Sequence, residues 1–199
     1  MGADLNEALD DESSRGMIRI LHVEDSEIDA LTVKTMLHSR QGAAMGIVRA
    51  GTLAEARTLL GAGGFDLVLL DLNLPDSKGL STVRALLAET DGSPLIIALT
   101  GEDYDETGLG VLKEGAQDFL PKAALSADAL RRSILNALER KRLERALSWE
   151  RRRAEEYLDI APVIIVVQDA EGRIVRINRA GCEALGGRGD ARAHARLVA

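Results

Sequence analysis

Three carboxylates each come directly after a short apolar run of the chain. Glu24 and Asp25 follow the run that ends at Val23, and Asp71 follows the run that ends at Leu70. Carboxylates gathered in one small volume repel one another unless a cation joins them, and hard oxygen ligands of this kind suit Mg²⁺. If the two runs are neighbouring strands, the three side chains form a magnesium site.

Two further groups stand at the ends of later apolar runs. Thr100 and Gly101 combine a hydroxyl donor with a residue that cannot obstruct a phosphate, and Lys122 supplies a mobile positive charge. Phosphoryl transfer depends largely on positioning and charge neutralisation. We therefore predict that Asp71 attacks a phosphoryl group whose oxygens are held by Mg²⁺, Thr100 and Lys122.

The elements that would position these groups alternate along the chain. Apolar runs predict five strands, and amphipathic stretches predict four helices between them and a fifth that begins near Ser126. This alternation favours an α/β fold, a flavodoxin-like doubly wound five-stranded parallel sheet with strand order 2-1-3-4-5. The predicted strands are residues 19–23, 44–50, 67–70, 95–99 and 118–120, and the helices between them are residues 26–39, 53–60, 80–88 and 105–114.

Helix-capping signals support these boundaries. Thr52 and Glu55 have the spacing of a capping box, and Ser126 offers a hydroxyl N-cap to the last helix. That helix has an apolar stripe that continues until Pro162, which predicts an extended C-terminal helix of roughly 45 Å for some thirty residues. Its charged part, residues 139–156, is either a solvated helix face or part of a coiled coil that joins two protomers.

Beyond Pro162 the sequence predicts a β-hairpin and a short helix. The strands are residues 163–168 and 173–177, a tight turn at 169–172 joins them, and the helix covers 180–185. The segments 1–16 and 186–199 have little to bury and are predicted to be disordered.

Composition excludes several function classes. The formal net charge is -7, whereas binding to nucleic acid relies on many Lys and Arg side chains. The longest strongly apolar run is far shorter than the ~20 residues of a membrane span, and Cys182, the single cysteine, fits a reducing compartment. We expect a cytoplasmic protein without nucleic-acid or membrane partners.

With these motifs in place, residues 17–140 resemble the response-regulator receiver domain of two-component systems. The resemblance is carried by Glu24-Asp25, by Asp71 with Pro75 and Gly79 after it, by Thr100-Gly101 and by Lys122. It implies that Asp71 takes a phosphoryl group from a histidine kinase or a phosphotransfer protein. It also implies that Asp25, Asp71 and the backbone carbonyl of Asn73 ligate Mg²⁺, and that Glu24 acts through a bound water.

The same resemblance implies that the domain is a conformational switch in signalling and not an enzyme. The phosphoryl group would draw in the Thr100 hydroxyl, and the ring of Phe119 would turn into the vacated space, which changes the surface of the last helices. The domain would assist its own phosphorylation and dephosphorylation. One departure from the family is that Pro121 precedes Lys122 and Ala123 follows it.

A second resemblance covers residues 157–186, which look like the opening of a PAS sensory domain around Ile177-Asn178-Arg179-Ala180. The predicted organisation is thus a receiver domain, a coiled-coil linker at 141–160 that forms a homodimer, and a partial PAS-like segment at 161–199. So small a piece seldom makes a stable core, and no ligand binding is expected from it.

Rival functions meet specific obstacles. A phosphatase of the haloacid dehalogenase type needs an acid two residues after its nucleophile, where this chain has Asn73. A flavodoxin-type carrier needs a phosphate-binding loop where Glu24 and Asp25 would repel the phosphate. A receiver-like scaffold that acts without phosphorylation stays open. His22 lies in a predicted strand and is expected to be a core residue with its hydrogen bonds satisfied.

Overall fold

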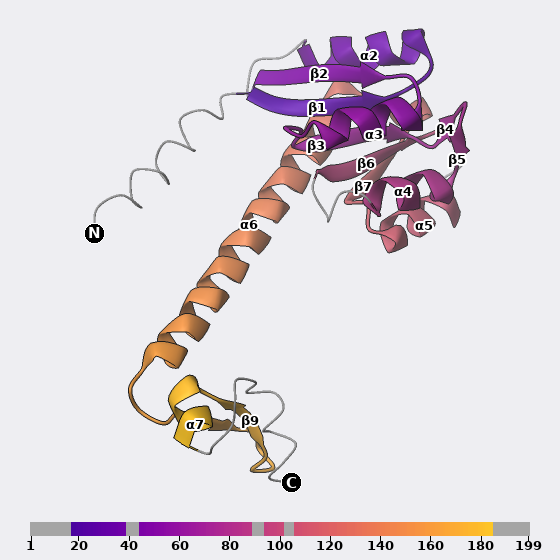
Figure 1. The fold of residues 1–199 in the computed structure, drawn as a ribbon. Helices are drawn as coiled ribbons and strands as arrows, with labels where there is room; N and C mark the ends of the chain where they lie inside the picture. Colours follow the sequence, from indigo (N-terminus) through magenta and orange to yellow (C-terminus); the bar gives the residue numbers. More distant parts are fainter. Residues whose placement is uncertain (1–16, 39–43, 89–93, 102–105, 185–199) are drawn as a thin grey trace. The chain divides into compact units, whose positions relative to one another are not determined.

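A parallel sheet of five strands forms the centre of the N-terminal region in the computed structural model, which describes residues 17–38, 44–88, 94–101 and 106–184 (Figure 1). The strand order β2-β1-β3-β6-β7 confirms the predicted order 2-1-3-4-5. The strands are β1 (Met17–Val23), β2 (Ala44–Ala50), β3 (Leu67–Asp71), β6 (Leu95–Thr100) and β7 (Asp118–Pro121).

Helices cover both faces of this sheet. Side chains of successive strand residues point to opposite faces, so Leu69 and Leu70 belong to different aliphatic clusters. Burial on both faces explains why the strands are nearly continuous apolar runs. One face packs against α2 (Glu27–His38) and the start of α6 (Ala127–Ile160), and the other against α3 (Leu53–Gly61), α4 (Leu80–Leu87) and α5 (Glu106–Glu114).

Polar side chains begin two helices, as predicted. The Oγ1 of Thr52 accepts the N–H of Glu55 at 3.1 Å, and the Oγ of Ser126 accepts the N–H of Ala129 at 3.2 Å. The capping box differs in one detail, because the Glu55 carboxylate accepts the N–H of Gly51 at 2.8 Å rather than that of Thr52. The extended helix is also confirmed, since α6 ends only at Ile160.

A small hairpin that the sequence did not indicate follows Asp71. It consists of β4 (Asn73–Leu74) and β5 (Ser77–Lys78), which are antiparallel. Gly79 closes it with a φ of 61° and donates its N–H to the carbonyl of Leu72 at 2.7 Å. The loop is also tied to α3, because the carboxylate of Asp76 accepts the N–H groups of Leu53 and Ala54 at 2.9 and 3.0 Å.

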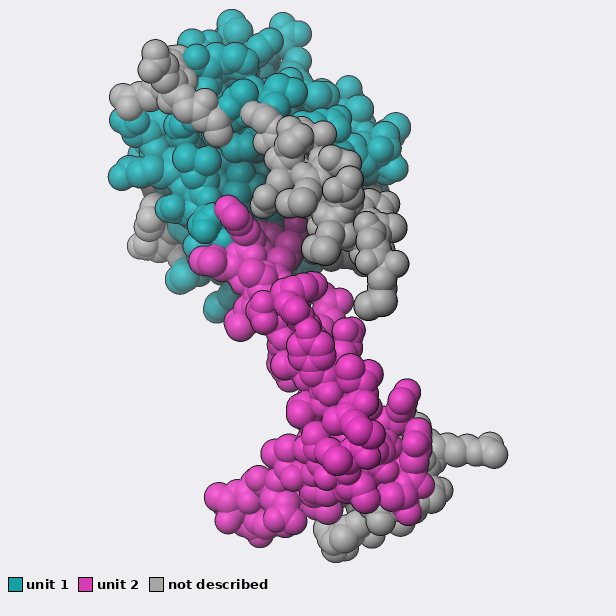
Figure 2. Space-filling model, turned by 90° about the vertical axis from the view of Figure 1, so that its left-hand side faces the viewer, with its two compact units in different colours: residues 1–140 teal, residues 141–199 magenta. Residues whose placement is uncertain are grey.

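The chain divides into two compact units, residues 1–140 and residues 141–199 (Figure 2). Beyond the last turns of α6, the second unit contains β8 (Val166–Gln168), β9 (Ile174–Ile177) and α7 (Arg179–Ala184). The predicted segments 1–16 and 186–199 lie outside the described residues. Assignment of a receiver, a linker and a PAS-like segment to particular boundaries stays a prediction.

The first strand of the hairpin is shorter than predicted, since β8 begins at Val166 rather than at residue 163. The buried side-chain amide of Asn178 hydrogen-bonds to backbone groups of residues 163–165, which precede β8. It accepts the N–H of Ile165 at 2.9 Å and donates to the carbonyl of Val163 at 2.8 Å. It also donates to the carbonyl of Leu158 at 3.0 Å. These backbone groups are therefore satisfied without a neighbouring strand.

Within the described part of the chain, no helix combines the length and the apolar character that crossing a membrane requires.

Candidate functional site

Glu24, Asp25 and Asp71, here called the acid cluster, meet at the carboxyl ends of the adjacent strands β1 and β3. One carboxylate oxygen of each residue lies within 4.8 Å of those of the other two. Glu24 is 0% exposed and Asp71 is 4% exposed, whereas Asp25 is open to solvent. The structure thus brings together the three carboxylates that the sequence predicts as metal ligands.

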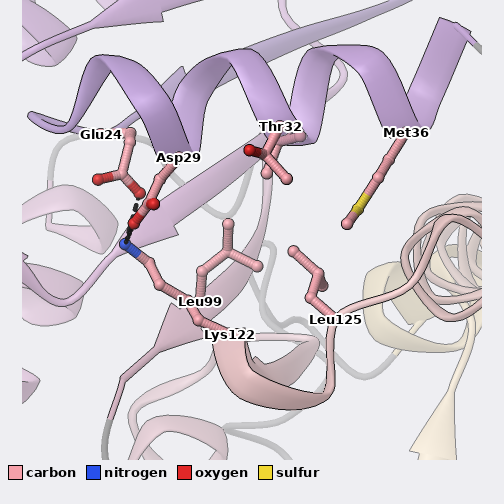
Figure 3. A pocket seen from close by; sticks show the side chains of 8 residues that line it. Glu24, Asp29, Thr32, Met36, Leu99, Lys122 and Leu125 are labelled. Carbon is pink, nitrogen blue, oxygen red and sulfur yellow. Dashed lines mark hydrogen bonds and ion pairs between the residues drawn. The ribbon is translucent and has the colours of Figure 1, made fainter.

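Lys122, in the 3₁₀ turn η1 (Lys122–Ala124), reaches into this cluster. Its Nζ lies 2.7 Å from Oε2 of Glu24 and 2.7 Å from Oδ2 of Asp71. A third carboxylate, that of Asp29 on α2, lies 2.9 Å away (Figure 3). An ammonium group has three hydrogens to donate, and each here has a carboxylate acceptor. Burial by itself lowers the pKa of Lys122, but the hydrogen bonds to the carboxylates raise it above its ordinary value, so Lys122 is charged.

Burial dominates the electrostatics of Glu24. It raises the pKa of this carboxyl group, and the nearby charge of Asp71 acts in the same direction. The hydrogen bonds that Glu24 accepts from Lys122 and from the N–H of Ser26 oppose the shift. Further positive charge at this point would therefore stabilise the ionised carboxylates.

The donor set of the acid cluster fits a divalent hard cation. All three side chains offer carboxylate oxygens, which are the ligands that Mg²⁺ prefers. One ammonium group opposes three carboxylates within the cluster and a fourth at Asp29, so negative charge is in excess.

Arg49, which the sequence did not indicate, holds the loop that carries two members of the cluster. Its Nε donates to the carbonyl of Glu24 at 2.9 Å and its Nη2 to the carbonyl of Asp25 at 2.6 Å. Arg49 lies on β2, opposite His22 of β1 in the strand register. In the sequence, only the predicted pairing of these two strands could have indicated that Arg49 lies near the acid cluster.

The other predicted site residues lie at the same edge of the sheet. Asn73 donates its N–H to Oδ1 of Asp71 at 2.9 Å, while metal binding by its carbonyl stays a prediction. Thr100 is buried at the end of β6, one residue beyond the Asp71↔Leu99 pair of strand partners. Phe119 on β7 is half-buried and packs against the core on the side of α3, α4 and α5. The switch assigned to Thr100 and Phe119 likewise stays a prediction.

His22 corrects one expectation. It is only 1% exposed, as a core residue should be, but neither ring nitrogen has a hydrogen-bond partner among the described residues. The prediction of satisfied hydrogen bonds was therefore wrong. Burial, assisted by the charge of Lys122, lowers the pKa of His22 to about 4, so that its ring is neutral.

The fold and the site define a doubly wound α/β protein with an acidic cluster and a lysine at the carboxyl edge of its sheet. Residues 20–135 match the family model of the response regulator receiver domain. The chain belongs to this family.

Relatives agree with this placement. The chain is 39% identical over 105 residues to the swarming motility regulation protein RssB of Serratia marcescens, a match that covers 53% of this chain and 46% of that protein. It is 31% identical over 105 residues to the cell cycle transcriptional regulator CtrA of Caulobacter vibrioides, covering 53% of this chain and 44% of that protein. The matches therefore span less than half of either relative.

Among solved structures, the fold resembles the signal receiver domain of a LuxO repressor protein from Vibrio parahaemolyticus. The TM-score is 0.58 and the sequence identity 27%, and the match covers 66% of this chain and 97% of that domain. Nearly the whole of that receiver domain thus has a counterpart here.

Proposed function

We propose that this protein is a phosphorylated signalling switch in which Asp71 accepts a phosphoryl group from a histidine kinase or a phosphotransfer protein. Glu24, Asp25 and Asp71 would hold Mg²⁺ with the backbone carbonyl of Asn73. The observation that carries the proposal is the close approach of the three carboxylates, with oxygens within 4.8 Å, in a chain of the receiver family. Lys122, whose Nζ is 2.7 Å from Asp71, supplies the adjoining positive charge.

The transfer forms a bond between a carboxylate oxygen of Asp71 and phosphorus. The bond from phosphorus to the donor's imidazole nitrogen breaks, and the nitrogen keeps the electron pair. Bound Mg²⁺ supplies charge neutralisation for the phosphoryl oxygens. The chain's own contribution is to orient Asp71 through the N–H of Asn73, which lies 2.9 Å from Oδ1, and to offer the Lys122 ammonium and the Thr100 hydroxyl to the same oxygens.

The signal would leave the site through the Thr100 and Phe119 switch and the last helices. The apolar side chains Leu143, Leu147 and Tyr157 on α6 are exposed in the single chain, as expected if a second copy covers them. We include a homodimer through α6 and a cytoplasmic location in the proposal. A receiver-like interaction or dimerisation scaffold that acts without phosphorylation is the alternative.

Chemical labelling separates these two functions. Incubation with acetyl phosphate and Mg²⁺ should add one acid-stable, hydroxylamine-labile phosphoryl group, measured by intact mass. The variant Asp71→Asn should not be labelled. The matched control Asp66→Asn, at the opposite end of β3, should be labelled like the unaltered protein. Undiminished labelling of Asp71→Asn would remove the assignment, and a protein that takes no label under any of these conditions would favour the scaffold.

A further inference from the structure

Lys122 has one acceptor that lies outside the acid cluster. Oδ2 of Asp29 is 2.9 Å from its Nζ, close to the 2.7 Å of the two contacts with Glu24 and Asp71. Asp29 stands in the first turn of α2, one helical turn beyond Asp25, and its side chain is 44% exposed. Figure 3 shows the Lys122 nitrogen beside the carboxylates of Glu24 and Asp29, with dashed lines to both.

The backbone of Asp29 is anchored, and open space adjoins the Lys122 side chain. The N–H of Asp29 donates to the Ser26 hydroxyl at 3.3 Å, which anchors the start of α2. Below this helix lies a small cavity of about 80 Å³ beside the Lys122 side chain, with Leu99 and Leu125 also in its wall (Figure 3). The Lys122 side chain therefore borders open space, while the backbone of its outer partner is anchored.

The three contacts of Lys122 differ in whether they can persist during phosphoryl transfer. Transfer to Asp71 places the phosphoryl group on the carboxylate that Lys122 now contacts, and Glu24 is part of the proposed metal site. Asp29 belongs to neither the nucleophile nor the acid cluster, so only its contact can persist unchanged. A partner of this kind limits the side-chain freedom that Lys122 would otherwise lose on binding the phosphoryl oxygens.

We propose that Asp29 is a positioning residue that holds the Lys122 ammonium beside the acid cluster before and during phosphorylation of Asp71. This role rests on the proposed function. Because Asp29 is half-exposed, the ion pair is worth a modest amount, and its loss should slow phosphorylation by about two- to fivefold.

The first test compares labelling rates with acetyl phosphate at saturating Mg²⁺. Asp29→Asn should slow labelling by this factor, and Asp29→Glu, which keeps the charge, should restore part of the rate. Glu27→Gln is the matched control, because it removes a carboxylate from the same helical turn. The Glu27 side chain is 90% exposed and is not bonded to Lys122. Equal rates for Asp29→Asn and the unaltered protein would overturn the proposal.

A double-substitution cycle separates positioning from a general structural effect. If Asp29 acts through Lys122, Asp29→Asn should change the labelling rate no further in a Lys122→Met background. The same slowing in both backgrounds would show that Asp29 acts in another way.

A second readout does not depend on phosphorylation. The ammonium signal of Lys122 in proton–nitrogen NMR, assigned by its loss in Lys122→Met, should be protected from solvent exchange in the unaltered protein and in Glu27→Gln. Asp29→Asn should reduce that protection, because only the contacts with Glu24 and Asp71 remain, and an unchanged signal would contradict the positioning role. If no variant can be labelled, the proposed function fails, yet this spectrum still decides whether Asp29 holds the lysine.

Discussion

Charge balance decides the behaviour of individual residues at the site. The Lys122 ammonium contacts Glu24 and Asp71, two of the carboxylates that we propose as Mg²⁺ ligands. A bound metal ion would therefore compete with the lysine for the same oxygens, and Asp29 offers the lysine a partner outside that competition. Each positive charge at the site stabilises the ionised carboxylates by reducing the repulsion among them.

Removal of the lysine charge should separate metal binding from phosphorylation of Asp71. In Lys122→Met the magnesium dissociation constant should fall about tenfold, which corresponds to about 1.4 kcal/mol of removed repulsion, while labelling by acetyl phosphate should slow. Titration calorimetry at low ionic strength measures the first effect. Lys113→Met, on the exposed side of α5, is the control and should bind Mg²⁺ as the unaltered protein does. Weaker magnesium binding by Lys122→Met would contradict the competition.

His22 should make stability depend on pH. Its pKa is about 4 in the folded chain against 6.5 unperturbed, so the unfolded chain binds the proton first. The stabilising effect of the neutral ring is complete above pH 6.5 and is lost as the pH falls toward 4, by roughly 3 kcal/mol in all. Urea unfolding at pH 7 and pH 5 should therefore differ by about 2 kcal/mol more in the unaltered protein than in His22→Leu. The exposed His38→Gln should keep the full difference, and an equal loss in both variants would exclude His22 as the cause.

The sequence predicted the strands of the central sheet, because these elements follow from the alternation of apolar runs. Strand order follows from it, and with it the meeting of Glu24, Asp25 and Asp71 at one edge. Asp29 and Arg49 escaped prediction because their roles depend on the reach of long or rotated side chains, which strand and helix assignments do not specify. The β4–β5 hairpin has strands too short to show a period.

The hairpin of the second unit illustrates the same limit. The side chain of Asn178 hydrogen-bonds to backbone groups of residues that the sequence predicts to be a strand. It also hydrogen-bonds to the backbone in the last turns of α6. The spacing of apolar residues along the sequence does not predict hydrogen bonds between a side chain and distant backbone groups.

Asn178→Ala should loosen the second unit selectively. The buried amide accepts from Ile165 and Gly181 and donates to Leu158 and Val163, so its removal leaves several backbone groups without partners. Hydrogen exchange measured by mass spectrometry should rise throughout β8, β9 and α7 and remain unchanged in β1, β3 and β6. Asn136→Ala, on the exposed side of α6, is the matched control. Unaltered protection of β8 and β9 in Asn178→Ala would show that the hairpin is held by other contacts.

The proposed phosphorylation of Asp71 would have to be transmitted from the sheet edge to a partner. The receiver family accounts for residues 20–135, and α6 continues well beyond them to Ile160 with apolar side chains exposed. A second copy of the chain is the partner that we propose for this part of the helix.

Substitution of the exposed stripe should test that partner. The double variant Leu143→Glu and Leu147→Glu should have a lower mass by light scattering than the unaltered protein, because the charges would be buried in a helix pair. Glu144→Gln, elsewhere on the same helix, should leave the mass unchanged. An unaltered protein that is monomeric with and without a phosphate mimic would count against the dimer.

Magnesium uptake by the acid cluster is the claim on which the signalling account depends most directly. Titration of the protein with MgCl₂ in a calorimeter should give one ion per chain, and Asp25→Asn should abolish or strongly weaken that uptake. No uptake by the unaltered protein, or equal uptake by Asp25→Asn, would contradict the account.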